Sequence, residues 1–176
     1  MSNIQLIHPQ PKWQDSFIDL LNEAKCANEV SELGHAYRPD EDYSTMYMRL
    51  KNREQGINIH PRDVPSCLYW ILDMKSGVIV GTLDMRYKIT GDYFERLGHV
   101  AYYIKPRERK KGYATEALRQ VLELYKIRKE KKILITCYKD NIASQKVIQK
   151  NGGILESEKE DPKNSNHIIQ RWWIVL

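Results

Sequence analysis

The sequence is poor in cysteine, with only Cys26, Cys67 and Cys137 among its 176 residues and no CxxC pair. An odd number of widely spaced cysteines excludes a disulfide scaffold and a cysteine-rich zinc site, and it favours a reducing compartment, so we expect a cytoplasmic protein. No apolar run approaches the ~18 residues of a membrane helix. The first residues lack a basic segment followed by an apolar one. We therefore expect neither a membrane partner nor a signal peptide.

Several short motifs of common enzyme classes are also missing. The sequence has no GxxxxGK[ST], no GxGxxG after a strand and no GxSxG, and its five histidines never form HxH or HExxH. A P-loop NTPase, a dinucleotide-binding Rossmann unit, a hydrolase nucleophile elbow and a histidine metal site are therefore not indicated. We expect no metal ion.

The length and composition of the sequence predict one globular domain spanning residues 1–176. Apolar residues make up 41% and charged residues 29%, which is enough apolar material for a core. The 28 lysines and arginines exceed the 23 acidic residues and give a net charge of +5. This mild excess favours an anionic partner, and a nucleotide cofactor, RNA or an acidic surface would all fit.

The spacing of apolar residues predicts the element order β-α-α-β-β-β-α-β-α-β-β. The predicted strands cover residues 4–8, 67–74, 78–86, 98–104, 133–138, 154–158 and 168–176. The predicted helices cover residues 13–24, 42–53, 113–128 and 141–150, and residues 29–38 are expected to be loop. The helix between strands 98–104 and 133–138 is a crossover, so these two strands should be parallel. The expected class is mixed α/β (α+β), with a central mixed, mostly antiparallel sheet and helices on both faces.

The segment from 105 to 115 connects a strand to the strongest predicted helix. Arg107, Arg109, Lys110 and Lys111 precede Gly112, which lacks a Cβ and lets a ligand approach the backbone. The first N–H groups of a helix have no intrahelical partner, and together with nearby cations they can bind an anion. The alternative is a solvated basic loop with a glycine at the turn.

The spacing Arg109-x-x-Gly112-x-Ala114 resembles the R/Q-x-x-G-x-G/A signature of the GNAT superfamily of N-acetyltransferases. The later segment from Asn141 through Ser144 to residue 153 resembles the family's N-x-x-S/A-x-x-V/L-x-x-K-x-G helix. The resemblance covers about residues 64–158. Within this range the sequence is similar to a bacterial subgroup described only as predicted acetyltransferases. Residues 1–60 fit by element order alone.

The resemblance implies a GNAT-like fold in which the parallel strands 98–104 and 133–138 splay into a V-shaped opening that holds acetyl-CoA. It implies that the pantetheine arm pairs with backbone groups of Tyr102 and Ile104, that the pyrophosphate lies on the amides of the loop, and that Asn141 contacts the cofactor. The implied cofactor-binding residues are Tyr102, Tyr103, Ile104, Arg109, Lys110, Lys111, Gly112, Tyr113, Ala114, Thr115, Asn141 and Ser144.

Acetyl transfer to an amine needs an oxyanion donor and can use an acid for the leaving thiolate. The backbone N–H of Tyr102 or of its neighbour is the expected oxyanion donor. Many family members carry a tyrosine as the acid where this sequence has Ile148. Ser144, which corresponds to a serine given that role in ribosomal-protein acetyltransferases, and Tyr138 are the remaining candidates. Each also has a structural interpretation, Ser144 as a helix-start residue and Tyr138 as a core residue.

A base must accept the proton of the acceptor amine. His99 occupies the place where some family members have a glutamate, and its ordinary pKa of ~6.5 suits the role. Its apolar neighbours also allow a buried structural histidine. Glu29, Glu32 and a water chain without a single base are the alternatives.

The expected function is transfer of acetyl from acetyl-CoA to a primary amine, either of a small molecule or of a peptide N-terminus. A small nucleic-acid-binding domain is a competing hypothesis, but the cations are largely balanced by acids and the aromatics lie in strands expected to be buried. A CoA-binding relative without catalysis is the third hypothesis. Homodimers are frequent in the superfamily, and the sequence leaves the oligomeric state open.

Overall fold

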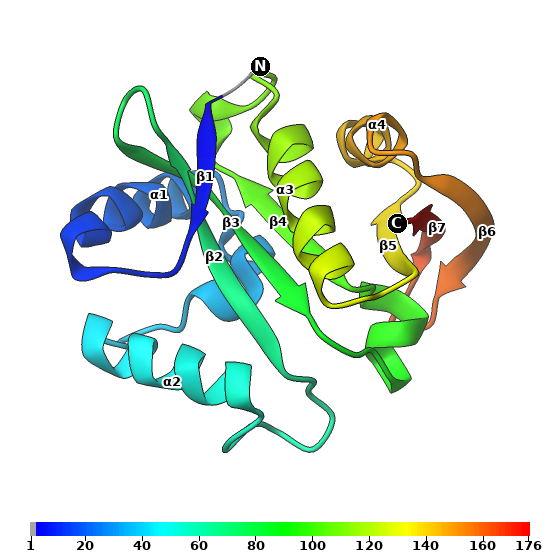
Figure 1. Cartoon of the computed structure of the whole chain (residues 1–176), viewed down its shortest axis with the longest axis horizontal. Helices are drawn as coiled ribbons and strands as arrows, with labels where there is room; N and C mark the ends of the chain where they lie inside the picture. Colours follow the sequence, from blue (N-terminus) through cyan, green and yellow to red (C-terminus); the bar gives the residue numbers. More distant parts are fainter. Residues whose placement is uncertain (1–2) are drawn as a thin grey trace.

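Seven strands form two separate antiparallel sheets in the computed structural model, which describes residues 3–176. The four-stranded sheet has the order β1-β2-β3-β4, and the three-stranded sheet has the order β5-β7-β6 (Figure 1). Their bounds are β1 Ile4–Ile7, β2 Ser66–Asp73, β3 Val78–Arg86, β4 Val100–Ile104, β5 Lys132–Tyr138, β6 Ile154–Asp161 and β7 Asn164–Val175.

Four α-helices cover the sheets, α1 Gln14–Cys26, α2 Tyr43–Gln55, α3 Tyr113–Ile127 and α4 Ile142–Lys150. The buried face of α3, which includes Leu118 and Val121, packs with strands of both sheets in one core cluster. Phe17 and Leu20 of α1 pack with Leu50 of α2 in a second cluster on the other face of β2. The expected mixed α/β class with helices on both faces is therefore confirmed (Figure 1).

Local sequence signals explain where the helices begin. The Asp42 carboxylate accepts a hydrogen bond from the Thr45 N–H at 2.8 Å and caps α2. The Asn141 side-chain oxygen accepts one from the Ser144 N–H at 3.0 Å and caps α4. Both are the residue types that satisfy the unpaired donors of a first turn. The expected element order is confirmed along the chain.

Two segments differ from the expectation. Residues Val30–Ala36, expected to be loop, form 3₁₀ turns, with Leu33 and Ala36 buried against α1. β6 and β7 extend to Asp161 and back from Asn164, so the expected polar loop is a short hairpin. Most side chains of β6 are exposed, and a strand exposed on both faces shows no apolar alternation in its sequence.

The expected central sheet is divided between β4 and β5. Within the described residues β4 pairs only with β3, and β5 pairs only with β7. Both strands begin at the same end of this boundary, because His99, just before β4, donates its backbone N–H to Leu134, early in β5, at 2.7 Å. This is the arrangement of a splayed parallel pair. Between residues 3 and 176 no helix is long and apolar enough to cross a membrane.

Candidate functional site

Two unpaired strand edges meet at the boundary between the sheets. β4 is the last strand of one sheet and β5 the first of the other, so each has one edge without a ladder. The Lys105 N–H donates to Val80 of β3 at 3.0 Å, which shows that alternate backbone groups of β4 face β3. The backbone groups of Tyr102 and Ile104 therefore face the unpaired edge. Such an edge can accept an extended molecule as an added strand.

The join between the sheets requires Gly98. This residue has φ +64°, and an added Cβ would lie 2.7 Å from the Leu134 carbonyl oxygen. The imidazole of the next residue strengthens the join, because His99 Nδ1 accepts a hydrogen bond from the Leu134 N–H at 2.9 Å. Both strands are held together here, and the edges beyond the join stay free of a ladder.

The loop before α3 has the conformation that its glycine predicts. Gly112 has φ +86° and stands at the N-cap of α3 without any side-chain cap, and Lys110 also has a positive φ of +63°. A Cβ on Gly112 would meet no atom within 4 Å, so the space beside it is open. The N–H groups of the first turn, in Tyr113, Ala114 and Thr115, lack intrahelical acceptors. The Tyr113 hydroxyl donates to Asp73 at 3.2 Å and ties this turn to β2.

The positive charge of the loop is smaller than the sequence suggests. Arg107 forms ion pairs with Asp19 and Glu23 of α1, and Lys111 pairs with Glu108 at 2.9 Å. Among residues 3–176, Lys110 is the one cation of the four without an ion pair. Acidic side chains therefore neutralise most of the charge of this loop, and those that pair with Arg107 are distant in sequence.

Arg109 contacts protein groups rather than an open site. Its guanidinium bonds to both carboxylate oxygens of Glu29, donates to the Ile104 carbonyl oxygen at 3.0 Å and stacks over the ring of Tyr103. The Tyr103 hydroxyl also donates to Glu29 at 3.0 Å. The hydrogen bonds from Arg109 hold the pKa of Glu29 below its usual range. Glu29 is thus a weak base, and the side chain of Arg109 acts by positioning the loop.

Tyr102 and Ser144 are brought together across the boundary. Their hydroxyl oxygens lie 2.7 Å apart, and Ser144 is buried in the first turn of α4. Burial raises the pKa of the Tyr102 hydroxyl above its usual range, so this group stays protonated at neutral pH. Asn141 holds the turn by capping it. From the sequence only backbone roles are expected for Tyr102, so the contact of its side chain with Ser144 is a feature that the sequence did not predict.

Tyr138 lies on the other face of β5. Its hydroxyl donates to Asp161 at 2.8 Å, and its ring stacks on His167 with the centroids 4.7 Å apart. Burial and the hydrogen bond to Asp161 raise its pKa. Its neighbour Cys137 packs against the core cluster that contains Ile148 of α4, so Tyr138 points to the opposite face of β5. The interpretation of Tyr138 as a core residue is therefore wrong, because its side chain is exposed.

His99 and Ile148 are structural in this fold. Burial lowers the pKa of His99, and its Nδ1 is already used by the Leu134 N–H. Ile148 is fully buried in the core below α4. Ile148 has no titratable group, and the His99 imidazole is held in the join by Leu134, so the surroundings of His99 do not favour the role of general base.

A sequence model described as an acetyltransferase (GNAT) domain matches residues 7–154. The chain belongs to the GNAT acetyltransferase family. No curated protein matches it significantly in sequence. As a member of this family it is an acetyl-CoA-dependent acetyltransferase. The matched region contains the loop before α3, the Tyr102–Ser144 pair and the β4–β5 boundary.

Solved structures of GNAT enzymes share the fold. One is a Salmonella typhimurium acetyltransferase that modifies the N-terminal serine of ribosomal protein L7/L12, with 16% identity, 100% of this chain and 96% of that chain covered, and a TM-score of 0.70. Another is the ribosomal-protein-S5-alanine acetyltransferase of Vibrio fischeri, with 13% identity, 99% and 94% coverage, and a TM-score of 0.67. The microcin C7 self-immunity acetyltransferase MccE, solved with acetyl-CoA and AMP, has 15% identity, 100% and 94% coverage, and a TM-score of 0.67.

A buried polar network lies on the α1–α2 side of this GNAT domain, and no motif predicts it. Arg53 donates to Ser66 at 2.8 Å, to Asp63 at 2.9 Å and to the Tyr93 hydroxyl at 3.1 Å. His35 lies 3.3 Å from the same hydroxyl. Burial lowers the pKa of His35 to about 4. These residues are far apart in sequence, and the buried position of Arg53 within an apolar helix face was the only available signal.

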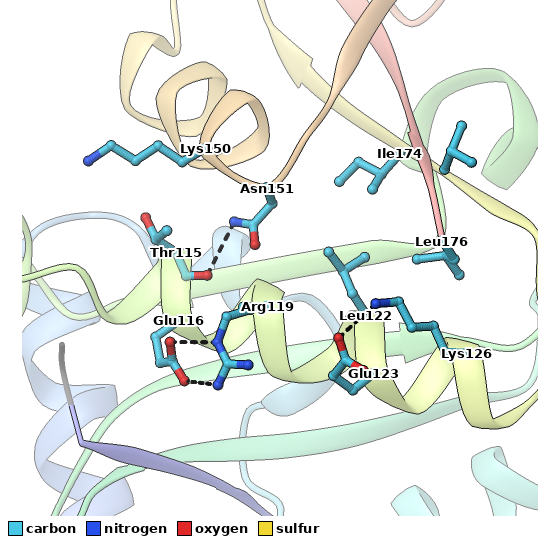
Figure 2. Close-up of a pocket in the computed structure, with 11 residues that line it drawn as sticks. Thr115, Glu116, Arg119, Leu122, Glu123, Lys126, Lys150, Asn151, Ile174 and Leu176 are labelled. Atoms are coloured by element: carbon cyan, nitrogen blue, oxygen red, sulfur yellow. Dashed lines mark hydrogen bonds and ion pairs between the residues drawn. The ribbon is translucent and has the colours of Figure 1, made fainter.

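A groove of about 350 Å³ lies between α3, the end of α4 and the end of β7 (Figure 2). The side chain of Asn151 points across it and donates to the Thr115 carbonyl oxygen at 3.2 Å (Figure 2). Thr115 is the one residue that the groove shares with the loop before α3, and neither Ser144 nor Tyr102 lines it. The groove is therefore separate from the Tyr102–Ser144 pair at the strand boundary.

Proposed function

We propose that this enzyme transfers the acetyl group of acetyl-CoA to a primary amine by direct attack in a ternary complex. The observation that carries the proposal is the pair of unpaired edges of β4 and β5 beside the uncapped first turn of α3. An extended pantetheine arm fits the edge at the backbone groups of Tyr102 and the N–H of Ile104, whose carbonyl oxygen already accepts from Arg109. A pyrophosphate fits the N–H groups that follow Gly112. Residues 1–176 act as one domain in this proposal.

The roles of the residues follow from their positions. The backbone of residues 110–115 binds the pyrophosphate, while Arg109 holds the loop through Glu29. A backbone N–H on the β4 edge stabilises the oxygen anion that forms on the acetyl carbonyl as the amine attacks. Ser144 donates a proton to the departing thiolate, and Tyr102 supports it through their shared hydrogen bond. The amine loses its proton to water, since neither His99 nor Glu29 is a free base. This chemistry needs no metal.

The acceptor is proposed as a primary amine of a peptide N-terminus or of a small molecule. One enzyme with the same fold modifies the N-terminal serine of ribosomal protein L7/L12, and another is a ribosomal-protein-S5-alanine acetyltransferase, which supports including peptides in the test. A cytoplasmic location stays a prediction that fits the three free thiols. A homodimer also stays a prediction. Nucleic acid and membrane are not among the proposed partners.

A thiol-release assay tests the proposal. Purified protein is mixed with acetyl-CoA and with a panel of peptides having free N-terminal Ser or Ala, polyamines and aminoglycoside-like amines, and release of CoA is followed with a thiol reagent. We expect release that depends on one acceptor class, with an acetylated product by mass spectrometry. N-terminally blocked versions of the same peptides are the control. Tight acetyl-CoA binding without turnover on any amine would support the non-catalytic alternative instead.

A further inference from the structure

Three metal-ligating side chains meet at the outer edge of the four-stranded sheet. His8 follows β1, Glu54 lies in the last turn of α2, and Cys67 lies in β2. One ligand atom from each lies within 4.8 Å of the other two. The residues are widely separated in sequence, so no spacing motif could reveal them. β3 separates β2 from β4 in the sheet, which places this cluster outside the proposed transfer site.

The distance between two of the ligand atoms already suits a metal ion. Cys67 Sγ and His8 Nδ1 are 3.6 Å apart. In tetrahedral zinc sites the Zn–S bond is ~2.3 Å and the Zn–N bond ~2.0–2.1 Å, which puts sulfur and nitrogen about 3.6 Å from each other. A carboxylate oxygen in the same shell would lie at a similar separation. A side-chain rotation that moves the Glu54 carboxylate oxygen by about an ångström would therefore complete this geometry.

A neighbouring hydroxyl orients the carboxylate. Tyr87 donates its O–H to Glu54 Oε1 at 2.9 Å, which leaves Oε2 for a metal. Hydrogen bonds of this kind fix the ligands of metal sites. The ring of Tyr69 packs against His8 with the centroids 5.0 Å apart and limits its motion. The Arg128 guanidinium lies 4.1 Å from the centroid of the Tyr87 ring and is a positive charge near this arrangement.

An ion can reach the cluster from solvent. Cys67 is only 1% exposed, whereas Glu54 is half-buried and His8 is exposed. His8 and Tyr69 also line a shallow hollow of about 370 Å³ beside β1. A thiolate and a carboxylate would balance the two charges of a divalent ion, and the proton of the thiol would leave to solvent.

We propose that His8, Glu54 and Cys67 bind a single Zn²⁺, with water in the fourth position. A thiolate, an imidazole and a carboxylate in a tetrahedral arrangement favour Zn²⁺ over Mg²⁺ or Ca²⁺, which prefer all-oxygen shells. The ion would connect β1, α2 and β2 and so has a structural role. This inference does not rest on the proposed acetyl transfer.

A thiol–imidazole hydrogen bond has the same separation as two zinc ligands, so the test must detect a metal–sulfur bond. Metal-free protein is titrated with Co²⁺, whose sulfur-to-metal charge-transfer absorption reports a bound thiolate, and then with Zn²⁺. We expect one equivalent of Co²⁺ to give this absorption and Zn²⁺ to abolish it. Cys67→Ser should lose the absorption, and Cys26→Ser, which changes an exposed cysteine outside the cluster, should keep it.

A second variant keeps the test decisive if Cys67→Ser does not fold. Glu54→Gln preserves an acceptor for the Tyr87 hydroxyl but removes the charge, and we expect its affinity for Zn²⁺ to fall at least ~10-fold. Zn²⁺ should also raise the melting temperature of the wild type more than that of Glu54→Gln. Absence of the charge-transfer band, its persistence in Cys67→Ser, or an unchanged affinity in Glu54→Gln would each overturn the proposal.

Discussion

At the scale of single residues, the hydroxyls of Tyr102 and Ser144 provide the sharpest test of the proposed chemistry, because they share one hydrogen bond of 2.7 Å across the β4–β5 boundary. Ser144→Ala removes the proposed proton donor with little change in volume. A thiolate is a fair leaving group, so we expect kcat to fall about 10- to 100-fold, at the low end of general acid catalysis. The measurement is kcat under conditions where chemistry limits the rate, with acetyl-CoA affinity checked separately.

Tyr138→Phe is the matched control for Ser144→Ala. It also removes one hydroxyl, but that hydroxyl bonds Asp161 on the other face of β5. We expect it to keep wild-type kcat while losing about 1 kcal/mol of unfolding free energy. Loss of kcat in Tyr138→Phe with wild-type turnover in Ser144→Ala would reverse the assignment.

Stability below neutral pH should depend on His35. Burial lowers its pKa to about 4 in the folded protein, whereas an unfolded histidine has a pKa of ~6.5. The unfolded chain therefore binds more protons between these values, and the free energy of unfolding falls as the pH falls through this window. Allowing for the partial exposure of the ring, we expect a loss of roughly 1–2 kcal/mol between pH 7 and pH 4.5.

Urea unfolding of the wild type and His35→Gln at pH 7, 5.5 and 4.5 measures this effect. His99, whose pKa is also lowered by burial, contributes in the same window and remains in both proteins. The carboxylates with lowered pKa, such as Asp161 and Glu29, also contribute less stability as the pH falls toward 4, and they remain in both proteins. An equal decrease in both proteins would show that His35 is not the group responsible.

The sequence predicted some site residues and missed others for definite reasons. Ser144 and Gly112 stand in local motifs, and they lie in the first turn of α4 and at the N-cap of α3. Arg109 also stands in a motif, but its partner Glu29 comes from a distant segment, so its ion pair could not be predicted. The contact of the Tyr102 side chain with Ser144 could not be predicted, because a strand pattern shows alternation and not what lies opposite each side chain.

At the scale of elements, the join before β4 depends on a residue without a Cβ. Gly98→Ala would place that atom 2.7 Å from the Leu134 carbonyl oxygen, in addition to its positive φ of +64°. Gly91→Ala is a matched control, because Gly91 has φ +52° and open space around it. We expect a loss of about 1 kcal/mol in unfolding free energy for Gly91→Ala and roughly 2–4 kcal/mol for Gly98→Ala. Thermal and urea unfolding would show the difference, and equal losses would contradict the account of the join.

The turn before α3 can be tested in the same way. Gly112→Val adds a branched side chain at φ +86°, in the open space where the backbone is proposed to meet pyrophosphate. Gly152→Val carries matched strain, because Gly152 has φ +83° and also has open space around it. Both variants should lose about 1–2 kcal/mol of stability. By calorimetric titration with acetyl-CoA, Gly112→Val alone should bind at least ~10-fold more weakly, and equal affinities would contradict the placement of the pyrophosphate.

Element order was predictable because capping residues and apolar periodicity are local. Asp42 and Asn141 cap the helices that they were expected to begin. The length of β6 was not predictable, because its side chains are mostly exposed and show no alternation. The 3₁₀ turns of residues Val30–Ala36 depend on packing against α1. The polar sequence of this segment gives no indication of that packing.

At the scale of the whole molecule, the division of the sheet is the feature on which the proposed function depends. The sequence predicted that β4 and β5 are parallel, because a helix crosses between them. It predicted the opening only through family resemblance, since nothing in the apolar pattern of either strand distinguishes a paired edge from an unpaired one. The structure shows two antiparallel sheets connected at Gly98 and His99.

The central claim is that acetyl-CoA occupies the β4 edge and the first turn of α3. Hydrogen–deuterium exchange with and without saturating acetyl-CoA tests it most directly, since the unpaired amides of Tyr102 and Ile104 should exchange readily in the free protein. We predict that acetyl-CoA slows exchange in peptides covering residues 100–104 and 110–115. Binding that instead protects the groove between α3 and α4, around Arg119 and Lys150, and leaves those peptides unchanged would contradict the account.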